Sequence, residues 1–124
     1  MNQANVFVVK KDAWGRVVER GLYVRGRRVG HFEIMDFDQK TLSQIQYTDC
    51  GNEQILRSRV YAMVCNRGGD FVGRGDLLHE SHRDADGTII LSTYEYVNGR
   101  RVGTAKQVRI KNGKPYPIKS HPGR

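Results

Sequence analysis

The same eight-residue pattern occurs twice in the sequence. The stretch YVRGRRVG occupies positions 23–30 and YVNGRRVG occupies positions 96–103, so only Arg25 and Asn98 differ between the copies. Asn-Gly between two runs of β-forming residues is the strongest short-range signal for a type I′ hairpin, because both central residues of that turn need positive φ. The pattern therefore predicts two tight hairpins, and the second glycine of each copy permits a β-bulge in the returning strand.

Turn signals recur along the whole chain, separated mostly by roughly 11 to 14 residues. They lie at Gly15, Gly26, Asp38-Gln39, Gly51, Gly68-Gly69, Gly75, Gly87, Gly99 and Gly113. This spacing fits strands joined by tight turns and is too short for helices with their loops. The runs between the turns are rich in β-formers that partly alternate with polar residues. The sequence thus predicts an all-β fold: an antiparallel meander of stacked β-hairpins, forming an open curved sheet or a half-closed barrel.

The middle of the chain follows this pattern least clearly. The segment EQILRSRVYAMVC at 53–65 fits a helix or a strand, and its β-branched and aromatic side chains favour the strand. The stretches that begin at Tyr47 and at Phe71 have the spacing of further, degenerate hairpin repeats between the two clear copies.

A chain of 124 residues fits one ordinary domain. We expect a single hairpin-repeat domain over residues 1–115 and a basic tail over residues 116–124, where Pro117 and Pro122 favour an extended chain. The chain shows no signal-peptide pattern and no run of about 18 apolar residues, so the sequence predicts a cytoplasmic protein without a membrane span. Both cysteines are then expected to remain thiols.

The first copy fits a longer pattern: a tyrosine, two residues, a glycine, three residues, a second glycine, one residue and an aromatic residue. The residues at these positions are Tyr23, Gly26, Gly30 and Phe32. This pattern resembles the MORN-type β-hairpin repeat, in the variant form common in bacterial proteins of antitoxin-like and immunity-like kinds. The resemblance covers residues 15–50 and 86–114, although Ala105 replaces the aromatic residue in the second copy. It implies a curved ladder of hairpins used for binding, with no catalytic residues to carry over. Stacking of successive hairpins would bury a continuous apolar face, and we expect the tyrosines and Trp14 to hold that stack together.

Basic and acidic residues are concentrated in different parts of the chain. Lysine and arginine number 21 against 13 aspartate and glutamate, a net charge of +8, and residues 99–124 contain no acid. Arginine pairs bidentately with carboxylates and phosphates, so we expect the hairpin arginines and the basic C-terminal stretch to contact a partner. These predicted contact residues are Arg25, Arg27, Arg28, Arg100, Arg101, Lys106, Arg109 and Lys111. A second, acidic contact patch is predicted at Glu33, Asp36 and Asp38.

Patterns of catalytic or metal-binding residues are weak. In HESHRDAD, His79 and His82 would point to opposite faces of a strand, and the usual zinc spacings are absent. Asp36 and Asp38 would share one strand face, which is more typical of a solvated surface than of an acid–base pair. The sequence therefore predicts a protein that is not an enzyme and that uses no cofactor or metal.

Two hypotheses of function remain. The first is a non-enzymatic binding module that recognises and inhibits a protein partner, such as a toxin or effector, in the manner of an antitoxin or immunity protein. The second is binding to nucleic acid or another polyanion through the arginine-rich hairpins and the basic tail, with Tyr94, Tyr96 and Tyr116 stacking on unpaired bases. The separate acidic and basic regions favour the first hypothesis, because they provide charge complementarity to a protein.

Overall fold

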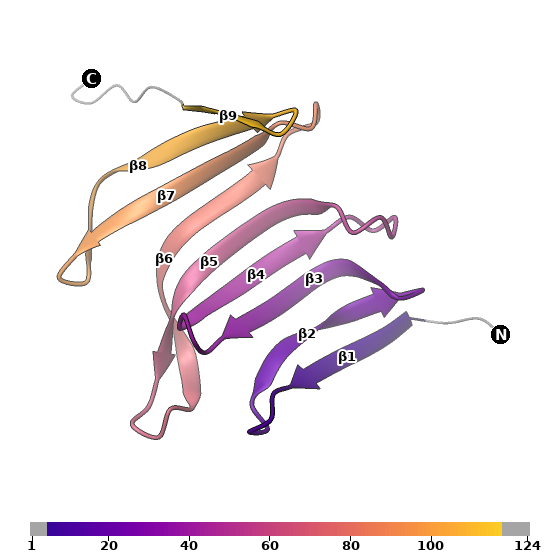
Figure 1. Ribbon diagram of the computed structural model, residues 1–124, viewed down its shortest axis with the longest axis vertical. Coiled ribbons are helices and arrows are strands. Elements are labelled where there is room, and N and C mark those ends of the chain that lie inside the picture. Colours follow the sequence, from indigo (N-terminus) through magenta and orange to yellow (C-terminus); the bar gives the residue numbers. More distant parts are fainter. Residues whose placement is uncertain (1–4, 118–124) are drawn as a thin grey trace.

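Figure 1 shows a computed structural model that describes residues 5–117, which form one antiparallel sheet of nine strands. The strands are β1 (Asn5–Lys11), β2 (Val17–Val24), β3 (Arg27–Asp36), β4 (Thr41–Tyr47), β5 (Ile55–Cys65), β6 (Phe71–Arg83), β7 (Ile89–Val97), β8 (Arg100–Lys111) and β9 (Lys114–Pro117). Each strand pairs with the next one in the chain, and β1 and β9 are the two edges of the open sheet. The predicted meander is confirmed in its open form, and the segment 53–65 forms strand β5 from Ile55 onward.

Both copies of the repeated pattern form the predicted type I′ hairpin. The central residues have positive φ in each turn: 53° and 78° at Arg25 and Gly26, and 52° and 79° at Asn98 and Gly99. The second glycine of each copy, Gly30 or Gly103, also has positive φ. The pairing register shifts in both hairpins opposite these glycines. The predicted β-bulges are therefore confirmed as well.

The two copies are inverted relative to each other in the sheet. Five antiparallel steps separate β2 from β7, so the two strands run in opposite directions. The β2–β3 turn and the β7–β8 turn consequently lie at opposite ends of the strands (Figure 1). Because the strand order is kept while the strand direction is reversed, a half-turn about the hydrogen-bonding direction relates the two hairpins. That rotation also exchanges the faces of the sheet, so equivalent side chains of the two copies point to opposite faces.

Two small clusters of buried side chains lie on opposite faces of the sheet. Phe32 is 1% exposed, and the rings of Tyr23 and Tyr47 meet it edge-on, each with a centroid distance of 5.4 Å. A Cβ atom added to Gly21 would lie 2.5 Å from the Phe32 ring, so only glycine leaves room for this ring. The second cluster lies near the β3–β4 turn and consists of Met35, Leu42 and Met63. Trp14, expected to help hold the hairpins together, is 78% exposed, so that expectation is wrong.

The two copies of the repeat differ in where their aromatic residues lie. The ladders of the two hairpins match at an offset of 73 residues, which is 96 minus 23. Tyr94 is therefore the counterpart of Gly21, and Ala105 is the counterpart of Phe32. The first hairpin therefore has a glycine on its first strand and an aromatic residue on the returning strand, and the second hairpin has an aromatic residue on its first strand and an alanine on the returning strand.

Gly75 and the end of the chain also differ from the sequence-based expectations. Gly75 was expected in a turn but lies within β6, where an added Cβ would meet the Val64 side chain at 3.3 Å. The glycine thus permits close strand packing, and β6 continues through it. Strand β9 includes Tyr116 and Pro117, which the sequence assigned to the tail. Residues 118–124 of that predicted tail lie outside the described residues.

Replacing Gly26 with valine is expected to lower the free energy of unfolding by about 2 kcal/mol, because a β-branched residue is strained at positive φ. Among residues 5–117, an added Cβ at Gly26 meets nothing within 4 Å, so the effect is expected to report backbone conformation. Gly73→Val is the matched control, since Gly73 in β6 also has open space around an added Cβ but no positive φ. Urea denaturation of both variants measures the difference, and equal stability would contradict the turn geometry.

Candidate functional site

One row of mostly polar side chains crosses the sheet from β2 to β8. Its members pair directly with one another in successive ladders, and paired residues of antiparallel strands point to the same face. We name these residues the polar row: Arg20, Glu33, Gln44, Arg59, Glu80, Ser92 and Gln107. The face of the sheet that carries them is called the polar face below. The row combines arginines, glutamates, glutamines and one serine from seven successive strands, so residues far apart in the sequence lie side by side.

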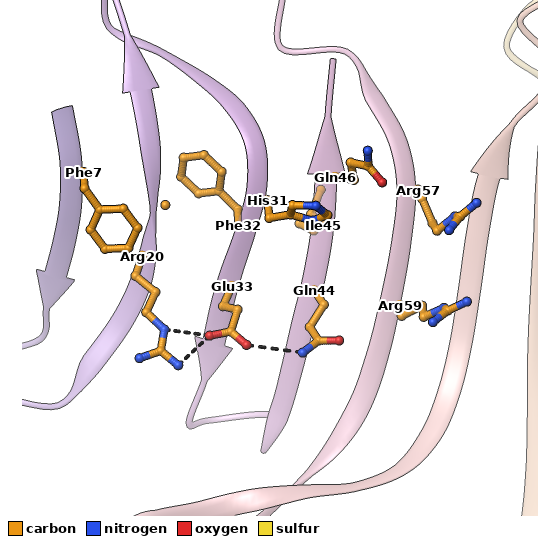
Figure 2. A pocket seen from close by; sticks show the side chains of 11 residues that line it. Phe7, Arg20, His31, Phe32, Glu33, Gln44, Ile45, Gln46, Arg57 and Arg59 are labelled. Atoms are coloured by element: carbon orange, nitrogen blue, oxygen red, sulfur yellow. Dashed lines mark hydrogen bonds and ion pairs between the residues drawn. The ribbon is translucent and has the colours of Figure 1, made fainter. Parts of the chain in front are cut away.

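Hydrogen bonds and ion pairs connect neighbours along the polar row. Glu33 is its best-connected member, because Arg20 Nη2 lies 2.6 Å from Glu33 Oε1 and Gln44 Nε2 donates to Glu33 Oε2 at 3.3 Å (Figure 2). Arg59 Nε lies 3.4 Å from Glu80 Oε2. These contacts fix the orientation of two arginines and of both carboxylates. The row is therefore an ordered set of donors and acceptors on an open surface.

A groove with a volume of about 400 Å³ runs along the polar row over β2 to β5. One side consists of Arg20, Glu33, Gln44 and Arg59, and the other side consists of His31, Gln46 and Arg57, which pair with one another in the ladders. Phe7 of β1 lies at one end of the groove, as Figure 2 shows. The groove holds three arginines and one carboxylate, so its charge is positive overall. No ion pair or hydrogen bond engages the Arg57 side chain among the residues that the structure describes.

An aromatic group continues the polar face beyond the groove, on β7 and β8. The hydroxyl of Tyr94 donates to Glu80 Oε1 at 2.8 Å, and the guanidinium of Arg101 lies 3.9 Å above the Tyr94 ring. The hydrogen bond to Glu80 raises the pKa of Tyr94 above its ordinary value, and burial adds to this effect. The hydroxyl of Tyr96 donates to the carbonyl of Leu77 on β6. Glu80 therefore joins the aromatic group to the polar row.

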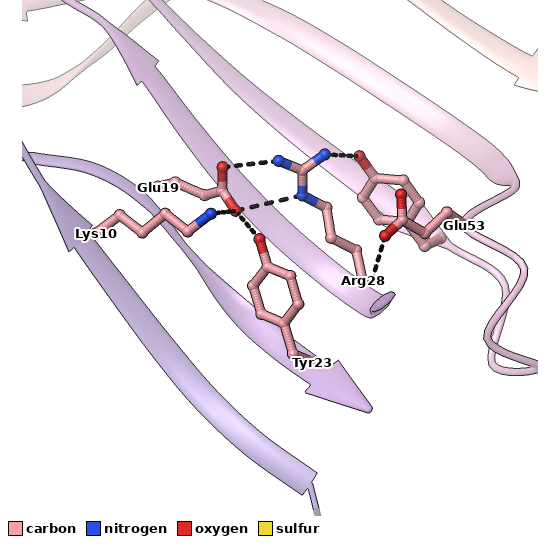
Figure 3. Close-up of polar contacts among 6 residues, drawn as sticks. Lys10, Glu19, Tyr23, Arg28 and Glu53 are labelled. Atoms are coloured by element: carbon pink, nitrogen blue, oxygen red, sulfur yellow. Dashed lines mark hydrogen bonds and ion pairs between the residues drawn. The ribbon is translucent and has the colours of Figure 1, made fainter. Parts of the chain in front are cut away.

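The opposite face carries a partly buried ion pair between Glu19 and Arg28 (Figure 3). Arg28 donates from Nη2 to Glu19 Oε1 at 2.9 Å and from Nε to Glu19 Oε2 at 3.3 Å, while Tyr23 donates to Oε2 at 2.6 Å. Burial alone would raise the pKa of Glu19, but the hydrogen bonds from Tyr23 and Arg28 outweigh it and hold the pKa below its ordinary value. The same hydrogen bonds to Glu19 raise the pKa of Arg28. This pair therefore stabilises the fold beside Phe32.

The basic residues predicted to contact a partner do not form one surface. Arg25, Arg27 and Arg28 belong to the β2–β3 hairpin, whereas Arg100 and Arg101 belong to the inverted β7–β8 hairpin, at the other end of the strands. Several of them are engaged within the protein. Arg27 donates to the carbonyl of Gly51, Arg28 pairs with Glu19, Arg101 stacks on Tyr94, and Lys106 Nζ lies 2.6 Å from Glu95 Oε1. Arg109 is exposed on the polar face, and Lys111 is exposed next to the β8–β9 turn.

The predicted acidic patch is also divided. Glu33 belongs to the polar row, and Asp36, three residues further along the same strand, points to the other face. Strand β3 ends at Asp36, whose Oδ1 accepts the backbone N–H groups of Asp38 and Gln39 at 3.0 Å each. The expectation that Asp36 and Asp38 share a strand face is therefore wrong, because the carboxylate of Asp36 closes the turn.

Most residues of the groove were not predicted from the sequence. Its arginines and glutamines occur at two-residue spacing within their strands, as Gln44 with Gln46 and Arg57 with Arg59. This alternation was the available signal, because side chains two residues apart in a strand share a face. His79 and His82 do lie on opposite faces of β6, as expected. Within residues 5–117, no group of three or more His, Cys, Asp or Glu side chains is placed to hold a metal ion.

Comparison with protein-family models, with curated proteins and with solved structures gives no match to this chain. The described part of the chain contains no helix long and apolar enough to cross a membrane. The function is therefore inferred from the geometry of the sheet.

Proposed function

We propose that this protein is a non-catalytic binding protein that recognises a protein partner through the groove on its polar face. The groove is the observation that supports this proposal. Its volume is about 400 Å³, and it is lined by side chains of both charges, by glutamine amides and by the exposed ring of Phe7. Such a mixture suits the polar and charged surface of another protein. The partner is a toxin or effector that the protein inhibits, in the manner of an antitoxin or immunity protein. The resemblance of the hairpins to MORN-type repeats supports a binding role.

The ion pairs on the sheet favour a protein partner over a nucleic acid. Arg20 and Arg59 already pair with carboxylates of the polar row, so neither guanidinium is fully available for phosphate. Phosphate recognition draws its affinity from unneutralised lysine and arginine. Fixed charges of both signs instead give specificity for a protein surface of complementary charge. Arg57, the groove arginine without such a pair, then contacts an acidic group of the partner.

The alternative is binding to nucleic acid or another polyanion. It is favoured by the net charge of +8 and by Arg57 and Arg109, which both point from the polar face. Fluorescence anisotropy with labelled single-stranded and double-stranded DNA and RNA, at two salt concentrations, distinguishes the two functions. Tight binding that weakens steeply with salt would establish the alternative.

Arg57→Glu is expected to weaken the binding of the protein partner at least about tenfold, because it reverses the charge of the unpaired groove arginine. Arg67→Glu is the matched control, since Arg67 is exposed in the turn between β5 and β6, away from the residues that line the groove. A partner is captured by crosslinking with the wild-type chain as bait, and its affinity for purified wild-type and variant chains is then measured. If the two variants bind the partner with equal affinity, the groove is not part of the interface.

A further inference from the structure

We propose that two copies of this chain pair through β1, antiparallel and edge to edge, so that one sheet continues from one copy into the other. Among residues 5–117, strand β1 pairs only with β2, so within the described part of the chain its outer side presents backbone N–H and C=O groups without a strand partner. Its side chains are unusually apolar for an edge: Val6 is 51% exposed, Phe7 is 65% exposed and Val9 is 48% exposed. The ladder to β2 is regular from Asn5 to Lys10, so β1 offers a straight template.

The two edges of the sheet differ in how they are protected. Strand β9 contains two prolines, Pro115 and Pro117, which have no backbone N–H to donate. Short edge strands, prolines and lysines are the common devices that prevent pairing between sheets. Strand β1 is seven residues long, contains no proline and has its two lysines at one end. The sheet thus blocks one edge and leaves the other open to a further strand.

The sequence of β1 is complementary to itself in the antiparallel direction. Pairing centred on Val8 uses all seven residues and places Phe7 opposite Val9 of the second copy, a favourable aromatic and β-branched pair. The same register places Lys10 opposite Val6 and Lys11 opposite Asn5, so no lysine faces a lysine. Lys10 is further neutralised by Glu19, whose carboxylate lies 3.8 Å from its Nζ. A second copy of the chain is therefore the occupant that fits this edge.

The pairing would also enlarge the polar face. A two-fold axis normal to the sheet relates antiparallel copies, and it keeps equivalent faces on the same side. The groove ends at Phe7 of β1, so the two grooves would meet across the new ladder. The dimer would present two copies of the groove on one continuous surface. Pairing through β1 does not depend on which partner the groove binds.

Two double variants test both the pairing and its register. In F7K/V9K, the introduced lysines of the two copies would face each other at both contacts, so the repulsion is expected to give a monomer. In F7E/V9K, glutamate would face lysine at both contacts, so the dimer is expected to be retained. Positions 7 and 9 are exposed in the single chain, and circular dichroism checks that both variants fold. Sedimentation equilibrium of the full chain, from about 1 µM to about 1 mM, measures the mass over the range of ordinary dimer affinities.

The wild-type chain is expected to have a mass of twice 14.2 kDa at the higher concentrations. F7K/V9K is expected to be a monomer, and F7E/V9K is expected to be a dimer. A wild-type chain that stays monomeric throughout overturns the self-pairing and leaves the β1 edge to a strand of a different protein. A dimer that persists in F7K/V9K places the contact elsewhere. A monomeric F7E/V9K overturns the register centred on Val8. None of these outcomes changes the partner binding measured with Arg57→Glu, so the two proposals fail separately.

Discussion

Replacing Phe32 with alanine is expected to lower the free energy of unfolding by about 3–5 kcal/mol. The ring is 1% exposed between Tyr23 and Tyr47 and rests against the backbone of Gly21. A single-layer sheet has no second layer to close the cavity that the lost ring leaves, and small domains have little stability in reserve. We therefore expect the Phe32→Ala chain to be largely unfolded at 37 °C or close to it.

Phe7→Ala is the matched control for this prediction. It removes the same side chain from the same sheet, but at a position that is 65% exposed. In the single chain, at protein concentrations below those of the β1 pairing, its effect on the free energy of unfolding is expected to stay within about 0.5 kcal/mol, as for most surface substitutions. Urea denaturation followed by tyrosine fluorescence measures both variants. Similar losses in the two variants would show that the Phe32 cluster is not the core of the sheet.

Replacing Arg28 with alanine is expected to lower the free energy of unfolding by about 2–3 kcal/mol at neutral pH, because it leaves a buried carboxylate without its charged donor. Glu19 is 8% exposed and, among the described residues, would retain only the hydroxyl of Tyr23 and the more distant Lys10 as partners. Arg101→Ala is the matched control, since Arg101 is the counterpart of Arg28 in the second hairpin and stacks on Tyr94 instead of pairing with a carboxylate. Its loss is expected to stay within about 1 kcal/mol.

The same pair predicts how stability depends on pH. The pKa of Glu19 is lowered in the folded protein from its ordinary 4.5, so the unfolded chain binds more protons between the two values. The stabilisation is therefore complete above pH 4.5 and is lost as the pH falls through the folded pKa. In Arg28→Ala this acid-dependent loss should shrink, because the hydrogen bond and the charge of Arg28 no longer lower the pKa of Glu19, although the hydrogen bond from Tyr23 remains. Urea denaturation at neutral pH and below pH 4.5 measures the difference, and an unchanged pH dependence would show that Arg28 does not hold the pKa down.

The strands and their turns could be predicted because they depend on neighbouring residues. Asn98-Gly99 and Arg25-Gly26 specify type I′ turns through the φ values that they must adopt, whatever the rest of the chain does. The strand order followed from tight turns, since a strand joined to the next by a hairpin pairs with it. Gly75 was misread because a glycine can serve close strand packing as well as a turn, and only the contact with Val64 distinguishes the two.

The candidate site depended on the whole sheet, and the sequence-based prediction of it was incomplete. The hairpin arginines look equivalent in sequence, yet Arg28 and Arg101 point to opposite faces, because an odd number of antiparallel steps separates their hairpins. The groove arises where Arg20, Gln44 and Arg57 meet on one face, and each bulge along the meander shifts which residues share that face. Short stretches of sequence determine the local conformation of the backbone. The face of a side chain and its ion-pair partner are set by pairing registers summed over all the strands between them, and only the tertiary structure decides these.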